Sequence, residues 1–378
     1  MDSTLYSVFV YFLTLLLMLF FNAMSIRNAQ ERLNAKPKVN IPLLSILIFA
    51  IVFGIRYDVG IDHLRYIEQY DSIRIFDADV DAEIGFVTVE RFFSFFNAHY
   101  ALFFTFIAFL QLFLICYSLR NNYEVIGWMF ITFMFSTIFL NFMNGIRQEV
   151  AFCFQTVAIY FLSQRKLLLC YLMLLLAILF HSSAILLLPL PLLFIWKSSY
   201  FNKISLQLIL FFLSIVISFL FKPAVAIFTL LLDFMEILGY GGYKYMFLGG
   251  DMSYLEAKRE PGLGFLLLIM MNLINIIQSR NVKSYFNSNF LNIVYDFYFV
   301  GIVYNYLISG SLILGRVNYY FYNFSFIISA FTLHYLFSCK GRLNKLLFFA
   351  LLAIYILVFC AVVILRGPEN RAIYNTFL

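Results

Sequence analysis

Long apolar stretches separated by short polar loops run through the whole chain. Many approach or exceed the roughly 17 to 25 residues with which an α-helix crosses about 30 Å of hydrocarbon. They lack the period-two alternation of a membrane barrel, so the pattern predicts helical spans, about twelve in all. The expected spans lie near Leu5–Phe21, Ile41–Ile55, Tyr100–Leu119, Val125–Phe142, Ile146–Leu162, Leu167–Phe180, Ala184–Trp196, Ser205–Phe221, Gly262–Gln278, Asn289–Ile308, Ile313–Phe337 and Leu346–Leu365.

Composition agrees with a bilayer environment. Hydrophobic residues make up 63% of the chain, whereas in soluble domains the apolar share is nearer half. No hydrophilic loop is long enough to fold alone, and no repeat or linker divides the sequence. We therefore expect an all-α polytopic integral membrane protein with one transmembrane domain over residues 1–378. The net charge of +6 is spread among loops, which does not indicate a nucleic-acid partner.

The basic residues of the short loops indicate an orientation, because cytoplasmic loops are typically rich in Lys and Arg. The loops expected to face the cytoplasm carry Arg27, Arg32, Lys36, Lys38, Arg120, Arg165, Lys166, Lys197, Lys203, Arg280, Lys283, Lys340, Arg342 and Lys345. Both termini then lie outside, together with the segments that hold Arg56, Arg147, His181 and Arg316.

Two segments on the outer side have the pattern of interfacial or re-entrant structure. Residues 83–96 place Glu83, Glu90 and Arg91 among aromatic and branched side chains, an apolar face that can lie along a membrane. Residues 223–238 are apolar until two late acids. The following tract, residues 240–260, is rich in Tyr, Gly and charge, and we expect it to form a mobile lid.

A polar island stands out at residues 56–70, where three basic and three acidic groups, counting His63, occur within fifteen residues. Asp62 precedes Tyr66 by four positions, which in a helix would give one hydrogen-bonding face, and Gly60 could supply a turn before it. A solvated loop with an internal Arg–Asp pair is the alternative. An arginine at the end of a span, such as Arg56, is costly unless it is paired or binds an anion, which favours a site.

A second constellation is Asn144-Gly145-Ile146-Arg147-Gln148-Glu149. Arg147 falls in the first turn of a predicted helix, where free N–H groups favour an anion, and its guanidinium can grip phosphate oxygens bidentately. Asn144 and Gln148 are one turn apart. The alternative is a contact of Arg147 with Glu149 or with a lipid headgroup.

A third constellation is His181-Ser182-Ser183, in a short turn between two apolar helices. A histidine that stays neutral there can accept a proton near pH 7, which suits a general base for a hydroxyl nucleophile. A helix cap is the alternative. Arg316 lies a few residues into a later span and is followed by tyrosines, which suit sugar stacking but also occur in ordinary interfacial belts.

Metal and nucleotide chemistry have little support in the sequence. Asp77, Asp79, Asp81 and Glu83 alternate, but they lack the glycine and glutamate of a complete calcium loop. A solvated acidic loop is favoured, and no cofactor is predicted; a divalent cation is possible but not favoured. No phosphate loop, HExxH helix or GxSxG elbow occurs, which disfavours ATP hydrolysis and proteolysis.

Taken in order, four short patterns resemble a known family. They are Arg56-Tyr57-x-Val59-Gly60-x-Asp62-x-x-x-Tyr66, Glu83-x-Gly85-Phe86, Asn144-x-x-Arg147-Gln148-x-x-Ala151 and His181-Ser182-Ser183-Ala184. Together they resemble the EpsG-type branch of bacterial polysaccharide polymerases, related in role to the Wzy O-antigen and capsule polymerases. Beyond Ala184 the likeness lies in hydropathy and in Arg316.

The resemblance implies a membrane glycosyltransferase, GT-C-like in fold, in the bacterial cytoplasmic (inner) membrane with its active site facing the periplasm or outside. Donor and acceptor would be oligosaccharides on polyprenyl pyrophosphate, delivered by a flippase, and a chain-length regulator is a further possible partner. The expected catalytic residues are His181 or Asp62 as base and Arg147 for charge stabilisation. The expected substrate-binding residues are Arg56, Tyr66, Glu83, Asn144, Gln148, Ser182 and Arg316.

Two other functions remain open on the sequence alone. A ligase-like glycan transferase would move a finished glycan to another acceptor. A lipid-linked-glycan flippase or other transporter would favour charges at several depths, whereas here most charges cluster on the outer side and Asp296 alone lies well inside a late span.

Overall fold

The computed structural model describes residues 3–31, 41–220, 262–308, 312–368 and 372–376. Across these ranges the chain is helical and holds no strand; an isolated bridge pairs Arg56 with Thr376. The all-α prediction is therefore confirmed. The predicted lid at 240–260 and the apolar segment at 223–238 lie outside the described residues.

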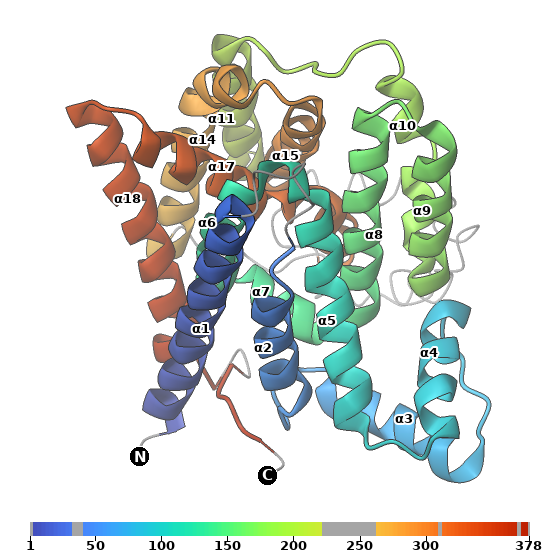
Figure 1. Cartoon of the computed structure of the whole chain (residues 1–378). Coiled ribbons are helices and arrows are strands. Elements are labelled where there is room, and N and C mark those ends of the chain that lie inside the picture. The colour runs from blue at the N-terminus through green and yellow to red at the C-terminus, as the bar shows by residue number, and fades with distance from the viewer. Residues whose placement is uncertain (1–2, 32–40, 221–261, 309–311, 369–371, 377–378) are drawn as a thin grey trace.

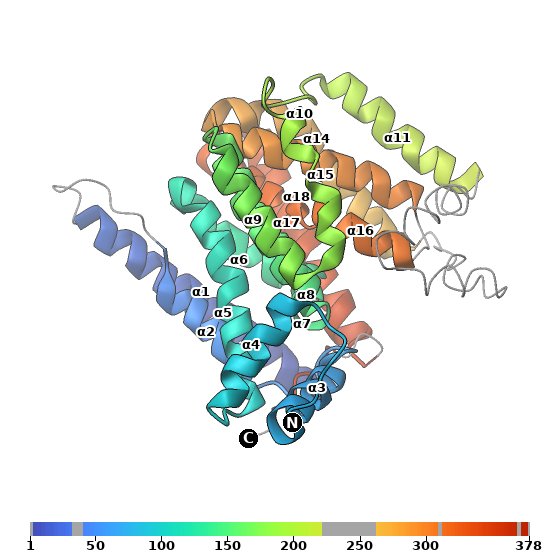
Figure 2. The ribbon, with the colours of Figure 1, turned by 90° about the vertical axis from the view of Figure 1, so that its right-hand side faces the viewer.

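The first half of the chain forms a bundle with a small cap at one end (Figure 1). Its helices are α1 (Ser3–Glu31), α2 (Leu43–Gly54), α3 (His63–Phe76), α4 (Ile84–Phe95), α5 (Tyr100–Ser118), η1 (Arg120–Val125), α6 (Ile126–Met134), α7 (Ile138–Asn144), α8 (Ile146–Ser163) and α9 (Leu167–Phe180). The cap consists of α3 and α4, and α4 reaches towards α9 in Figure 2. This places the predicted interfacial segment 83–96 at one end of the bundle.

The second half packs beside the first. Its helices are η2 (Ser182–Leu187), α10 (Leu190–Leu193), α11 (Ile204–Leu220), α14 (Leu263–Phe286), α15 (Asn289–Leu307), α16 (Leu312–Tyr322), α17 (Phe324–Ser338), α18 (Arg342–Phe359) and η4 (Cys360–Leu365). Helix α8 contacts α5, α9, α15 and α16, and almost all of its residues are buried. It is the central helix that joins the two halves.

Several helices have the character of membrane spans. Among the described residues four are long and apolar enough to cross a bilayer, or five if one bent pair counts as a span. Helix α1 leaves large apolar side chains such as Leu5 and Phe9 more than half exposed, as expected for a surface that faces lipid rather than water. The chain is therefore a membrane protein, and the count of about twelve spans stays a prediction.

The predicted span Val125–Phe142 is broken. Helices η1–α6 and α7 meet at an angle of 76°. At the break, the Ser136 hydroxyl donates to the carbonyl of Phe133 at 2.8 Å and accepts from the N–H of Ile138 at 3.2 Å. A short polar side chain thus takes over main-chain hydrogen bonds that a continuous helix would have made.

The predicted spans Ile313–Phe337 and Ala184–Trp196 are also interrupted. The first divides at Asn323, whose side-chain N–H donates to Glu149 Oε2 of α8 at 2.7 Å. The second divides into η2 and α10 around Pro189, because proline lacks the N–H that continues a helix. Apolar content predicted the membrane segments, but polar and proline positions decided where the helices end.

Gly301 is a close-packing point between α15 and α16. A Cβ there would lie 2.6 Å from main-chain atoms of Phe321 and Tyr322, so Gly301→Ala is expected to lower the free energy of unfolding by about 1–3 kcal/mol. Gly315→Ala is the matched control, because its Cβ would have no neighbour within 4 Å. Unfolding followed by circular dichroism in detergent micelles checks this, and equal stability of the two variants would contradict the packing.

Candidate active site

Glu83 lies between two of the predicted site residues. Its Oε2 accepts from Arg147 Nη1 at 2.6 Å, and its Oε1 lies 2.7 Å from His181 Nδ1. The N–H of Ser182 also donates to Oε1 at 3.4 Å. Three segments separated by 64 and 98 positions thus meet at one carboxylate. We call Glu83, Arg147 and His181 the Glu83 cluster.

Each member of the Glu83 cluster lies at the end of a helix. Glu83 has extended backbone angles just before α4, and Arg147 is the second residue of α8. His181 is extended (φ −157°, ψ 116°) between α9 and η2. Helix ends bring side chains to the margin of the packed bundle, and 16 to 27% of the surface of these three side chains remains exposed. The cluster is half-buried, and part of each side chain reaches the surface.

The electrostatics fix the protonation state of Glu83. Burial raises the pKa of the carboxyl, but the hydrogen bond with His181 and the charge of Arg147 outweigh it and lower the pKa to about 2. Glu83 is therefore ionised at neutral pH and can only accept hydrogen bonds. In its neutral form His181 can donate its Nδ1–H to the ionised Glu83 carboxylate, which leaves the Nε2 lone pair available as a base.

Neighbouring side chains hold Arg147 in place. The Tyr66 side chain lies near the Arg147 guanidinium, whose carbon is 6.0 Å from the centre of the Phe86 ring. Next to it, the Gln148 amide donates to the main-chain carbonyl of Arg316. Through these contacts α3, α4 and α16 all converge on the beginning of α8.

Hydrogen bonds that involve α16 and α8 fix the turn that carries His181. The hydroxyls of Ser183 and Tyr320 are 3.0 Å apart, and the Gln155 amide donates to the Tyr320 carbonyl at 2.9 Å. Tyr320 therefore ties η2 to α8 through α16. Ser182 and Arg316 belong to η2 and α16, and both residues are exposed.

Arg56 lies elsewhere and is almost fully buried, with 2% of its surface exposed. Its guanidinium donates to the carbonyls of Phe53, of Val59 at 3.4 Å and of Met143 at 2.9 Å. The structure thus gives Arg56 a role in joining α2, the following loop and α7.

The polar island does not form one continuous helix. Asp58 (φ 52°) and Gly60 (φ 96°) have left-handed backbone conformations, so α3 begins only at His63. The predicted turn at Gly60 is confirmed. Asp62 precedes the helix, and its N–H donates to Asn144 Oδ1 at 2.7 Å. The island therefore packs on α7, and its link to the Glu83 cluster is Tyr66.

The acidic run contributes one residue to the site. Asp79 pairs with Arg91 at 2.8 Å on the surface, whereas Glu83 faces the cluster. In the part of the chain that the structure describes, no group of three or more His, Cys, Asp or Glu side chains is placed to hold a metal ion.

Gly85 determines how closely α4 approaches α9. A Cβ at this position would lie 2.7 Å from the carbonyl of Leu179, so only glycine allows this contact. Leu179 is two residues before His181, and Gly85 is two residues after Glu83. Gly85 belongs to the Glu83-x-Gly85-Phe86 pattern, but that pattern alone does not predict the approach of α4 to α9.

Comparison with known proteins identifies the family. The model of the EpsG family matches residues 39–376, most of the chain. The chain belongs to the EpsG family. No curated protein and no solved structure matches it. Membership of the EpsG family suggests a glycosyltransferase-like polysaccharide polymerase.

The lowered pKa of Glu83 predicts that the stability of the fold depends on pH. Because its pKa in the fold lies below the ordinary 4.5, the carboxylate stabilises the fold above pH 4.5, and this contribution is lost as the pH falls towards about 2. Glu83→Gln should therefore cost up to about 3 kcal/mol at pH 6 and little near pH 2. The free energy of unfolding of the wild type and of Glu83→Gln, measured at several pH values, tests this prediction.

The exposed Asp79–Arg91 pair supplies a control for this measurement. The Asp79 side chain is fully exposed, so Asp79→Asn should leave stability almost unchanged at every pH. If Glu83→Gln and Asp79→Asn behave alike at pH 6, the electrostatic role of Glu83 is wrong.

Proposed function

We propose that this EpsG-family protein polymerises oligosaccharide repeat units carried on polyprenyl pyrophosphate at the outer face of the bacterial cytoplasmic membrane. The observation that carries the proposal is the Glu83 carboxylate, which holds His181 at 2.7 Å on one oxygen and Arg147 at 2.6 Å on the other. The same carboxylate thus binds both the proposed base for a sugar hydroxyl and the proposed cation for a pyrophosphate.

In the proposed reaction His181 Nε2 accepts the proton of an acceptor hydroxyl. The freed oxygen attacks the anomeric carbon of the donor glycan, and the bond from that carbon to the pyrophosphate oxygen breaks. Polyprenyl pyrophosphate leaves with the bonding electrons, and the glycan is longer by the transferred units. Glu83 keeps the imidazole in the required tautomer and stabilises the imidazolium that forms.

Arg147 stabilises the departing pyrophosphate. A guanidinium has five N–H donors, so the bond from Nη1 to Glu83 leaves others for phosphate oxygens. Gln148 fixes the α16 main chain at Arg316, whose exposed side chain supplies a second cation at this end. With arginines meeting the developing charge, the reaction needs no metal.

The arrangement of basic residues supports the outer location. Three segments lie at the end of the bundle opposite α3 and α4: the α8–α9 connection, the α10–α11 connection and the start of α18 (Figure 1). They carry Arg165, Lys166, Lys197, Lys203 and Arg342. Because cytoplasmic loops are rich in Lys and Arg, the Glu83 cluster belongs at the outer end, where a flippase delivers the lipid-linked units. A chain-length regulator would act on the same side.

Removal of either reacting group should abolish long polymers. His181→Ala removes the base and Arg147→Ala removes the charge that stabilises the leaving group, and each should slow chain extension at least about 100-fold. Gel analysis of lipid-linked glycans from cells that produce each variant measures the ladder of chain lengths.

Two residues at the same end of the bundle serve as matched controls. His99 is also a histidine at a helix end, where it accepts from the N–H of Ala101 at 3.3 Å, and Arg91 also pairs with an acid. His99→Ala and Arg91→Ala should keep the ladder. Undiminished long chains from His181→Ala or Arg147→Ala would contradict the site assignment. Transfer of one existing length would indicate a ligase, and flipping without bond formation a transporter.

A further inference from the structure

A groove of about 720 Å³ lies between the broken-span helix α7 and the helices α14 and α18–η4. Its volume is within the range of about 300–1,000 Å³ typical of small-molecule sites. Helices α14 and α18 are both long and apolar enough to cross a membrane. Two of the helices that line the groove are therefore candidate membrane spans.

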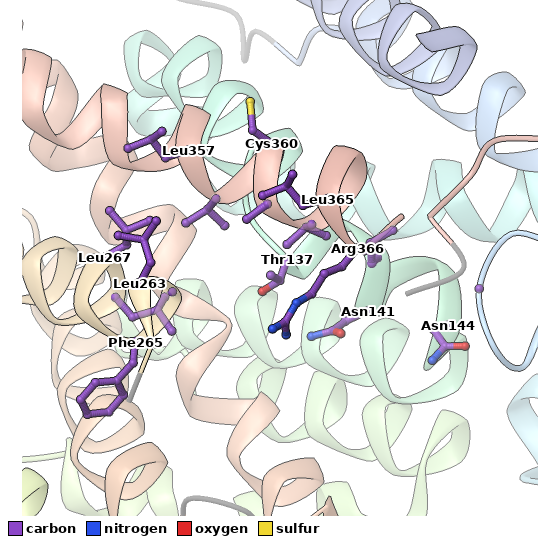
Figure 3. A pocket seen from close by; sticks show the side chains of 18 of the residues that line it. Thr137, Asn141, Asn144, Leu263, Phe265, Leu267, Leu357, Cys360, Leu365 and Arg366 are labelled. Carbon is purple, nitrogen blue, oxygen red and sulfur yellow. The ribbon is translucent and has the colours of Figure 1, made fainter. Parts of the chain in front are cut away.

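The two ends of the groove differ in polarity (Figure 3). One end is lined by Leu263, Phe265, Leu267 and Leu357, and the other by Thr137, Asn141, Asn144 and Arg366. Figure 3 shows the Arg366 side chain extending towards Thr137 and Asn141. An amphipathic groove with a cation at its polar end fits a ligand that has a long apolar chain and an anionic head.

Irregular backbone lines the groove on two sides. Thr137 stands at the break between α6 and α7, and the residues from Cys360 to Leu365 form a π-helical turn after α18. In a membrane, non-helical backbone is tolerated where it borders a cavity or is buried in protein. Single π-helical turns inside helices occur frequently at functional sites, because they redirect side chains. Here the turn is followed directly by Arg366.

The polar end of the groove and the Glu83 cluster both include residues next to the α7–α8 junction. Asn144 ends α7, and Arg147 follows three residues later in the first turn of α8. Gly60 also lines the groove, and its loop is fixed to Asn144 by the N–H of Asp62. The same loop continues into α3, where Tyr66 lies near Arg147. A ligand whose head reaches Arg147 can therefore place its chain along α7 into the groove.

We propose that this groove binds the polyprenyl chain of the donor lipid and that Arg366 contacts its phosphate groups. The proposal rests on the proposed function, which places a polyprenyl pyrophosphate at Arg147. The chain of that lipid must enter hydrocarbon close to its head, and Asn144, which lines the groove between α7, α14 and α18, is three residues from Arg147 in the sequence. Arg366 supplies a cation at the polar end of the groove.

Binding of undecaprenyl pyrophosphate without a glycan tests the groove. The purified full-length protein is titrated with this lipid in detergent micelles, and bound lipid is counted by native mass spectrometry. Leu357→Trp fills the groove and should weaken binding at least tenfold. Ile356→Trp is the matched control, because Ile356 immediately precedes Leu357 in α18, is similarly exposed (43% against 48%) and does not line the groove. It should bind as the wild type does.

Variants of Arg366 and His181 distinguish a failure of the groove proposal from a failure of the proposed function. Arg366→Ala should weaken binding about tenfold, and Arg366→Lys should restore part of it. His181→Ala should keep full lipid binding while it makes no polymer. If His181→Ala still makes long chains, the proposed catalytic function fails, whatever the lipid measurements give.

Photo-crosslinking tests the groove independently, in case a tryptophan variant misfolds. Benzoylphenylalanine at position 357 should crosslink to the lipid probe, and the same residue at position 356 should not. Equal binding by Leu357→Trp and Ile356→Trp, or equal crosslinking from both positions, would overturn the groove assignment. Displacement of the probe by phosphatidylglycerol at the same concentration would also overturn it, because the groove would then be an ordinary lipid site.

Discussion

The Glu83 carboxylate is the interaction on which the candidate site depends. A half-buried acid is costly unless its oxygens are paired, and here Arg147 occupies one oxygen and His181 the other. The pairing holds α4, the start of α8 and the end of α9 together. It requires the close approach of α4 to Leu179, which Gly85 permits. Loss of the acid would leave a half-buried guanidinium without its partner and an imidazole without a fixed tautomer.

The two arginines at helix ends illustrate two ways to accommodate a cation in an apolar bundle. Arg147 forms an ion pair with Glu83 and is partly exposed, whereas Arg56 is buried and donates to main-chain carbonyls. Those carbonyls belong to Phe53 and Met143, in the last turns of α2 and α7. The final carbonyls of a helix have no partner within it, so a buried arginine there satisfies groups that would otherwise be unpaired.

Interrupted helices give the fold its functional surfaces. The break after α6 turns α7 across the bundle, so that its end meets both the polar island and the first turn of α8. The break at Asn323 lets α16 carry Tyr320 to the turn of His181. In a continuous span these polar groups would face lipid or remain unpaired, whereas at a break they pair across helices.

The sequence by itself determined that the chain is a helical membrane protein, because apolar runs of this length have no other stable form. It also marked Glu83, Arg147 and His181, since polar groups in such surroundings are costly without a purpose. Only the tertiary structure decided that these three meet, that Arg56 instead joins main-chain segments, and that three predicted spans are broken. Helical periodicity acts over three or four residues, whereas contacts across 64 and 98 positions depend on which helices pack together. The groove beside Arg366 has the same origin, because its walls come from helices far apart in the chain.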